Sequence, residues 1–238
     1  MAAKQYLDLV NQVMVRVREP KVGTVTESTY SSLIGTFIND AKRAVEDAWN
    51  WQALRSICTF TLSPATYTYD LGSTALVGAG NEQNERSLLL FKKAYPAEAM
   101  AFDVSANNPF QLQYVPINDM NALYDLTSVH SPQTNPMFFG LVRSSTTLTL
   151  NLWENPSTAR NWKLYFKRPQ ADLANDADTL LVPWLPVVLL ATNYALNEKG
   201  EEVGTPGTIA EQRYMTALQD AIALDAVGDY NNLEFTVV

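Results

Sequence analysis

The stretch LIGTFINDAKRAVEDAWNW, residues 33–51, decides the fold, because a helical pattern ends there and a strand pattern follows at once. Its apolar residues recur at steps of three and four, which places them in one stripe along a helix. They are Ile34, Phe37, Ile38, Ala41, Val45, Ala48 and Trp49. After Asn50 the period changes to two, as expected for strands with one buried face. The alternating inward sets are Cys58, Phe60 and Leu62, and then Tyr67, Tyr69 and Leu71.

The charged residues of this helix predict a solvent-exposed face opposite the apolar stripe. Lys42 and Glu46 are four residues apart, and so are Arg43 and Asp47. Pairs of opposite charge at this spacing lie side by side on a helix and stabilise it by a few tenths of a kcal/mol. We therefore expect both pairs in water.

Helical periodicity also marks the two ends of the chain. We expect one helix over residues 4–18 and the helix of the opening stretch over residues 29–50. Near the C-terminus we expect a helix over residues 186–200 and a last one starting at Thr208, which forms a capping-box pattern with Glu211. The predicted buried side of the last helix consists of Tyr214, Ala217, Leu218, Ala221 and Ile222.

The middle of the chain, roughly residues 57–170, is mostly strand-like. Beyond the first hairpin, the expected elements are strands over residues 87–94, 138–143, 147–152 and 161–168 and a short helix over residues 117–126. In the last strand Trp162, Leu164 and Phe166 share one face. The polar segment VGAGNEQNER, residues 77–86, is expected to form a loop.

This order predicts an α+β fold, in which N- and C-terminal helices pack as one bundle around a β-rich insert resembling a sandwich or barrel. The predicted helical bundle domain comprises residues 1–55 and 171–232, and the β-rich domain comprises residues 56–170. Residues 233–238, LEFTVV, are apolar and extended in character, and we expect them to form a C-terminal arm.

Composition restricts the classes of function. With 238 residues, 47% of them hydrophobic, the chain is long enough and apolar enough to fold. A net charge of −8 argues against tight binding to nucleic-acid phosphates or to an anionic membrane surface. The longest apolar run, residues 180–191, contains two prolines and is shorter than the roughly 20 residues that span a bilayer. The N-terminus lacks the pattern of a signal peptide, so we expect a soluble, unsecreted protein.

The sequence offers little catalytic chemistry. With one histidine, His130, and one cysteine, Cys58, neither an intrachain disulfide nor a His/Cys zinc site can form. A dyad of Cys58 with His130 is formally conceivable, but Cys58 lies on the apolar side of a strand, which favours a buried, unreactive thiol. Phosphate-loop, dinucleotide and nucleophile-elbow motifs are absent. We therefore expect no enzyme, no cofactor and no metal.

One enzymatic alternative stays open at this point. Glu154 follows Trp153 at the end of a predicted strand, and the chain has five tryptophans. Glycosidases use a pair of carboxylates flanked by aromatic rings. A carbohydrate-active protein is therefore the alternative from another class, although the sequence indicates no second acid as a partner for Glu154.

Three pieces of sequence, in their order and spacing, give the chain a family resemblance. The first is the pair of helices YLDLVNQVMVRV and YSSLIGTFINDAKRAVEDAWNWQALR, and the second is the hairpin FTLSPATYTYDLG. The third runs from LTLNLWENPST through WKLYFKRP to VPWLPVVLLATNYALNEKGEE. Together they resemble the adaptor, or head-to-tail connector, proteins of tailed bacteriophages, the group that includes tail tubular protein A.

The resemblance implies a non-enzymatic virion protein of the phage neck, assembled in the host cytoplasm. Such adaptors form a homo-oligomeric ring, usually of about twelve copies, between the portal protein and a tail or nozzle protein. DNA passes through the lumen without specific binding. Carried onto this sequence, the resemblance makes the C-terminal arm the portal-docking segment, with residues Leu233, Glu234, Phe235, Thr236, Val237 and Val238.

Two alternatives accompany this reading. In the first, the arm folds back onto its own helices instead of docking onto the portal. In the second, the chain is another virion component, such as a tail-completion or nozzle protein.

The net negative charge of the chain fits a channel wall that repels phosphate and lets DNA slide. The candidate lumen residues are Glu201, Glu202, Asp220, Asp225 and Asp229.

Overall fold

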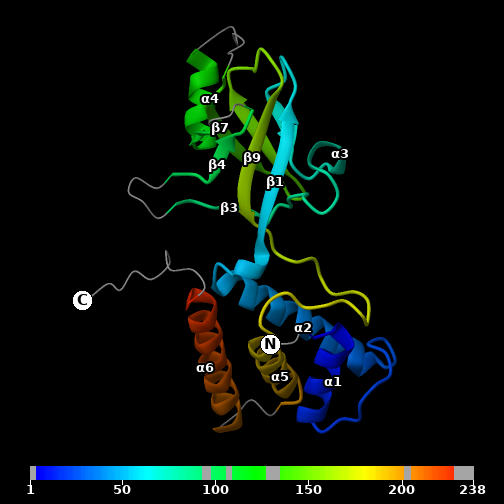
Figure 1. Ribbon diagram of the computed structural model, residues 1–238. Coiled ribbons are helices and arrows are strands. Elements are labelled where there is room, and N and C mark those ends of the chain that lie inside the picture. The colour runs from blue at the N-terminus through cyan, green and yellow to red at the C-terminus, as the bar shows by residue number, and fades with distance from the viewer. Residues whose placement is uncertain (1–3, 93–97, 106–108, 127–134, 201–204, 228–238) are drawn as a thin grey trace, which may run out of the picture. The chain divides into compact units, whose positions relative to one another are not determined.

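The computed structural model describes residues 4–92, 98–105, 109–126, 135–200 and 205–227, and of residues 123–126 and 205–208 only the backbone. The fold is α+β, as predicted. The chain divides into a helical unit, Met1–Leu54 with Pro169–Val238, and a β unit, Arg55–Arg168 (Figure 1). The helical unit is therefore assembled from two segments that are far apart in the sequence.

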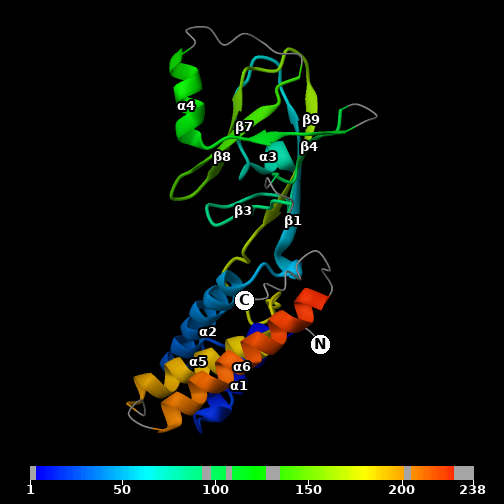
Figure 2. The same cartoon turned by 90° about the vertical axis from the view of Figure 1, so that its left-hand side faces the viewer.

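In the described part of the helical unit, the chain forms long helices that pack side by side (Figure 2). They are α1 (Tyr6–Arg16), α2 (Thr29–Ala48), α5 (Trp184–Glu198) and α6 (Thr205–Val227), and a 3-10 turn, η1 (Gln52–Leu54), follows α2. Helix α2 contacts α1 and α5, and α5 contacts α6. In the described part of the chain no helix has the length and apolarity that crossing a membrane would require.

The apolar stripe of α2 forms much of the core of this unit, as its spacing predicts. Ile34, Ile38, Ala41 and Val45 are fully buried among side chains of α1 and α5, whereas Ala48 is exposed. The helix begins at Ser28, whose hydroxyl accepts the backbone N–H of Ser31 at 3.0 Å while the Ser31 hydroxyl accepts that of Ser28. This reciprocal cap satisfies two N–H groups that have no partner inside the helix.

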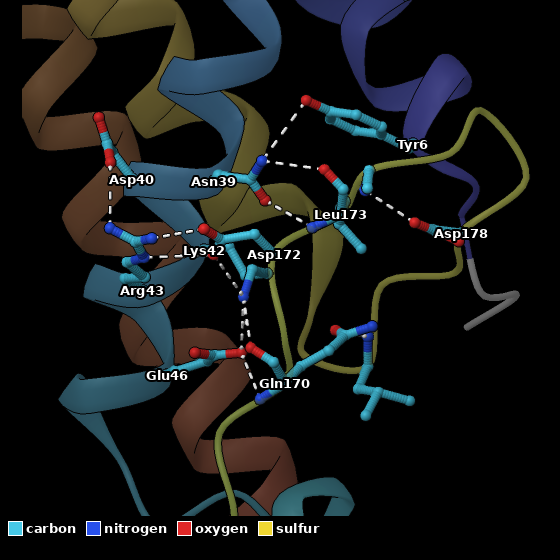
Figure 3. Close-up of polar contacts among 12 residues, drawn as sticks. Tyr6, Asn39, Asp40, Lys42, Arg43, Glu46, Gln170, Asp172, Leu173 and Asp178 are labelled. Atoms are coloured by element: carbon cyan, nitrogen blue, oxygen red, sulfur yellow. Dashed lines mark hydrogen bonds and ion pairs between the residues drawn. The ribbon is translucent and has the colours of Figure 1, made fainter. Parts of the chain in front are cut away.

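The expectation that Lys42 and Glu46 lie in water is wrong. Both side chains are fully buried, because the chain returning from the β unit runs along α2 and covers them (Figure 3). The Lys42 ammonium donates to the backbone carbonyl of Gln170 at 2.8 Å and to the Glu46 carboxylate at 3.4 Å. The same carboxylate oxygen accepts the backbone N–H of Gln170 at 3.1 Å. A buried ion pair is tolerated when such hydrogen bonds compensate its desolvation.

The return segment, residues 169–181, has further bonds to α2. The side chain of Asn39 donates to the carbonyl of Leu173 at 3.1 Å and accepts its N–H at 2.9 Å. Nearer the surface, the Arg43 Nε donates to Asp172 at 3.2 Å. Asparagine and glutamate side chains of α2 thereby bond the backbone of a segment that has no regular structure of its own (Figure 3).

The far end of the return segment caps α1. The carbonyls of Asp178 and Asp176 accept the backbone N–H groups of Tyr6 and Leu7 at 2.8 and 3.1 Å. The carboxylate of Asp178 accepts the N–H groups of Ala174 and Asn175, and these bonds lower the pKa of Asp178. The return segment therefore joins α1 to α2 before the chain enters α5.

The described residues of the β unit form two sheets. In one, β1 (Arg55–Leu62), β9 (Arg160–Lys167), β4 (Ala101–Asp103) and β5 (Phe110–Gln111) lie side by side in that order, and β3 (Leu88–Leu89) also pairs with β9. The other has the order β2 (Thr68–Asp70), β8 (Leu148–Trp153), β7 (Phe138–Arg143) and β6 (Gln113–Tyr114). Only β6 and β7 pair in parallel among the described strands.

Both sheets contribute to one core, as in a sandwich. Cys58, Phe60 and Leu62 of β1 pack with Trp162, Leu164 and Phe166 of β9, and these predicted inward faces are confirmed. Tyr69 and Leu71 are also buried as expected. Tyr67 is not, because it precedes β2 and is 46% exposed.

Several predicted elements differ in extent. Of the strand expected over residues 87–94, the described residues 87–92 form only β3, two residues long, and residues 93–94 lie outside the described ranges. Helix α6 begins at Thr205, so Thr208 lies inside the helix and the predicted capping box is wrong. The expected helix over residues 117–126 is α4 (Ile117–Leu126). It packs against β7 where Gly140 leaves space, since a Cβ there would lie 3.2 Å from the Met120 sulfur.

We predict that Lys42→Met lowers the free energy of unfolding of the helical unit by about 3 kcal/mol, because it leaves the buried Glu46 carboxylate without its cation. Urea titration followed by far-UV circular dichroism measures the change. The matched control is Arg43→Met, which removes a half-exposed pair with Asp172 and should cost about 0–1 kcal/mol. Equal losses in the two variants would contradict the role given to Lys42.

We also predict that the Cys58 thiol is unreactive in the folded protein. Burial raises the pKa of Cys58 to about 12, so the reactive thiolate is scarce at neutral pH and the side chain has no access to solvent. Iodoacetamide should label it only after denaturation, which mass spectrometry detects. The neighbouring exposed position supplies the control, since Thr59→Cys should be labelled in the native protein. Rapid labelling of native Cys58 would refute the described packing of β1.

Candidate docking groove on the helical unit

Helix α5 is apolar on nearly all sides, but it is not enclosed on all sides. Val187, Val188 and Ala191 are fully buried in the core of the helical unit. Leu185 and Leu189, on another side of the helix, are only half-buried. A helix that is apolar all round is normally surrounded by protein. One side of α5 therefore has no neighbour among the described residues.

Helix α6 carries two stripes instead of one. Tyr214, Leu218 and Ile222 pack against the core, so the predicted buried side is confirmed. A second stripe, at steps of three and four, is exposed. It consists of Ile209, Arg213, Thr216, Asp220, Leu224 and Val227. Its apolar members are 40% exposed at Ile209, 65% at Leu224 and 60% at Val227.

The open side of α5 and the second stripe of α6 form one groove. Its volume is about 730 Å³. We call it the docking groove, and it is lined by Pro183, Leu185, Pro186, Leu189, Ile209, Gln212, Arg213, Thr216, Ala217, Asp220, Ala221 and Leu224. Arg213 and Asp220 contribute one charge of each sign. The groove therefore favours an apolar ligand over one of high net charge.

A second hollow adjoins the docking groove. It has a volume of about 520 Å³ and shares Pro183, Ala221 and Leu224 with the groove. The indole of Trp184 lies in its wall, with the Lys4 ammonium 5.8 Å from the ring centre, and Leu181 is 51% exposed. Leu224 thus stands between two apolar depressions, which places it at the centre of the uncovered surface.

The proposed lumen residues have different surroundings. Asp220 is exposed at the docking groove. The Asp225 carboxylate instead accepts hydrogen bonds from the Trp49 indole at 3.0 Å and from the backbone N–H of Gln52 at 3.3 Å, which gives it a structural role. Glu201, Glu202, Asp229 and the C-terminal arm, residues 233–238, lie outside the described residues. The acidic lumen remains a prediction.

The residues considered for catalysis do not come together in a described site. Cys58 is buried in the sandwich core, and His130 lies outside the described residues. Glu154 follows β8 in a turn, where its backbone has a left-handed φ of 63°. Within the described ranges no group of three or more His, Cys, Asp and Glu side chains is arranged to hold a metal ion.

Sequence reasoning missed the docking groove. The signal was present in α6, because Ile209, Leu224 and Val227 fall outside the predicted buried stripe. Three large apolar side chains on a second face of a helix indicate a second contact. Nothing in the sequence showed that the open side of α5 would lie beside them.

Comparison with protein families gives a match over nearly the whole chain. A family model described as SU10 adaptor protein matches residues 4–234, which include both the helical unit and the β unit. No curated protein matches the chain.

We predict that Leu224 contributes little to the fold. Leu224→Ala removes a side chain that is 65% exposed in the described part of the chain and replaces it with a better helix former, so the free energy of unfolding should change by less than about 0.5 kcal/mol. Leu190→Ala, in α5, is the matched comparison, because Leu190 is buried and its truncation should cost about 2–5 kcal/mol. Denaturant titration measures both. A large loss for Leu224→Ala would mean that the groove is part of the core.

Proposed function

The chain belongs to the SU10 adaptor protein family, a family of phage adaptors, and we propose that it forms a ring between the portal and the tail of a tailed bacteriophage. The proposed role is structural and non-catalytic. The family match over residues 4–234 carries the proposal, since it spans the whole described fold. The chain is accordingly a component of the virion.

The docking groove supports a role in assembly. Soluble monomers rarely leave large contiguous apolar surfaces in water, and those that exist are usually contact sites. Here Leu185, Leu189 and Leu224 face a hollow large enough for several side chains. The β unit has a smaller hollow of about 260 Å³ at its exposed Leu88 and Phe91. We assign the helical unit to the portal and the β unit to the tail or nozzle protein.

The charge of the chain suits a DNA channel. At a net charge of −8, a ring of about twelve copies would surround DNA with an acidic wall that repels phosphate. Asp220 is the described acidic candidate for such a wall, since the Asp225 carboxylate is engaged within the helical unit. DNA would pass without being bound.

The C-terminal arm is the proposed portal contact. Leu233, Phe235 and Val237 alternate with Glu234 and Thr236, so an extended arm presents one apolar face. Such a strand can fill a groove or extend a sheet on a partner.

The test is sedimentation of the full chain with the portal ring of the same virus. We expect co-sedimentation at about twelve copies per portal. Replacing Leu233, Phe235 and Val237 by Ser should weaken portal binding at least tenfold, or about 1.4 kcal/mol. The matched control, Glu234→Ala with Thr236→Ala, alters the polar face and should bind normally.

Circular dichroism must show that both arm variants keep their helices. Absence of any association between the native chain and the portal would refute the adaptor position proposed here. Normal binding by the triple Ser variant would refute the arm as the portal contact and leave the ring proposal in place.

A further inference from the structure

We infer that, in the free protein, the C-terminal arm lies in the docking groove of its own chain. The arm follows this uncovered surface closely in sequence, because helix α6 ends at Val227 and the arm begins at Leu233. The docking groove ends at Leu224, within the last turn of the same helix. The occupant and the site are thus joined by a short piece of chain.

The chemistry of the docking groove matches that of the arm. Leu185, Leu189 and Ile209 give the groove aliphatic walls, and Ala217 and Ala221 give it a floor of small side chains. The arm supplies Leu233, Phe235 and Val237 on one face of an extended strand. An apolar strand over small residues can pack closely, while its polar Glu234 and Thr236 stay in water.

The lengths also agree. From Leu224 back to Ile209 the groove follows α6 for ~22 Å, at ~1.5 Å per residue. Residues 233–238 cover ~20 Å when extended, at ~3.3 Å per residue. Residues 228–232 can span up to ~17 Å, which is enough to reverse the direction of the chain. An arm running antiparallel to α6 therefore reaches from Leu224 almost to Ile209.

The residues between helix and arm are suited to this reversal. Gly228 directly follows α6, and glycine is the residue that most often ends a helix with a left-handed turn. Asn231 and Asn232 precede the arm, and asparagine also favours turns. Because the arm of the same chain is long enough to reach the docking groove, it has a high effective concentration there. It is therefore favoured over the arm of a second copy.

This seating gives the arm two alternative places, and that consequence rests on the proposed function. In the free chain the apolar face of the arm is covered by the groove. On the portal the same face is covered by the portal. The proposed binding of the arm to the docking groove occurs in the free chain, so it is tested without the portal.

A disulfide trap tests the inference. In the antiparallel register Val237 lies ~13 Å along the arm from Leu233, beside Thr216 of α6. We expect Thr216→Cys with Val237→Cys to form an intramolecular disulfide in most monomers under mild oxidation. Non-reducing electrophoresis and mass mapping identify it, and the buried Cys58 does not compete.

The matched control pairs Val237→Cys with Met215→Cys. Met215 is the next residue on α6 and is 49% exposed, but it does not line the docking groove. We expect at least tenfold slower closure for this pair. Equal rates would mean that the arm samples both faces, and a disulfide confined to dimers would make a second copy the occupant. Either result would overturn the inference.

A surface variant tests whether the docking groove itself holds the arm. Leu224→Asp places a charge at the mouth of the docking groove, on a side chain that is mostly exposed, so the helices should remain intact. When Leu224→Asp is added to the variant with Thr216→Cys and Val237→Cys, disulfide formation should become severalfold slower. Unchanged closure with intact helices would refute the groove as the seat of the arm. Portal binding is measured separately, so its failure would leave this result unaffected.

Discussion

The helical unit depends on one buried cation. Lys42 has no exposure to water, and its ammonium is satisfied by the Gln170 carbonyl and the Glu46 carboxylate. Helix α2 therefore buries this face only against the return segment, and the bonds between them fix the position of the segment that leads into α5. A hydrophobic pair at these positions could supply equal burial, but it would not specify which backbone carbonyl lies there. The ion pair thus couples two halves of a bundle that the β unit separates in sequence.

The same alignment creates the apolar surface of the docking groove. Once the return segment leads α5 into the unit, α2 and α1 cover part of α5, and α6 covers another part. The sides left over meet at Leu185, Leu189 and Leu224. The described residues thus leave this face of α5 uncovered, although the core of the helical unit is complete without it.

The periodicity of apolar residues predicts burial correctly where a helix or strand buries one regular face. It predicts the stripes of Ile34 and Val45 in α2 and of Trp162 and Phe166 in β9, and the α+β fold follows. It fails where burial is decided by distant backbone, as at Lys42 and Glu46, which a segment more than a hundred residues away covers. Strands of two or three residues, such as β5 and β6, are too short to show a period. The start of α6 was missed because Pro206 is compatible with the first turn of a helix.

The bonds of Asp225 have a mechanical consequence. Its carboxylate holds the last turns of α6 to Trp49 and Gln52, and the Gln52 side chain also donates to the Asp225 carbonyl at 2.8 Å. Gln52 lies three residues before β1 begins at Arg55. A pull on the end of α6 is therefore transmitted directly to Gln52 through these bonds. It does not have to pass along α5. The bonds of Asp225 thus bypass α5 and join the last turns of α6 to the residues just before β1.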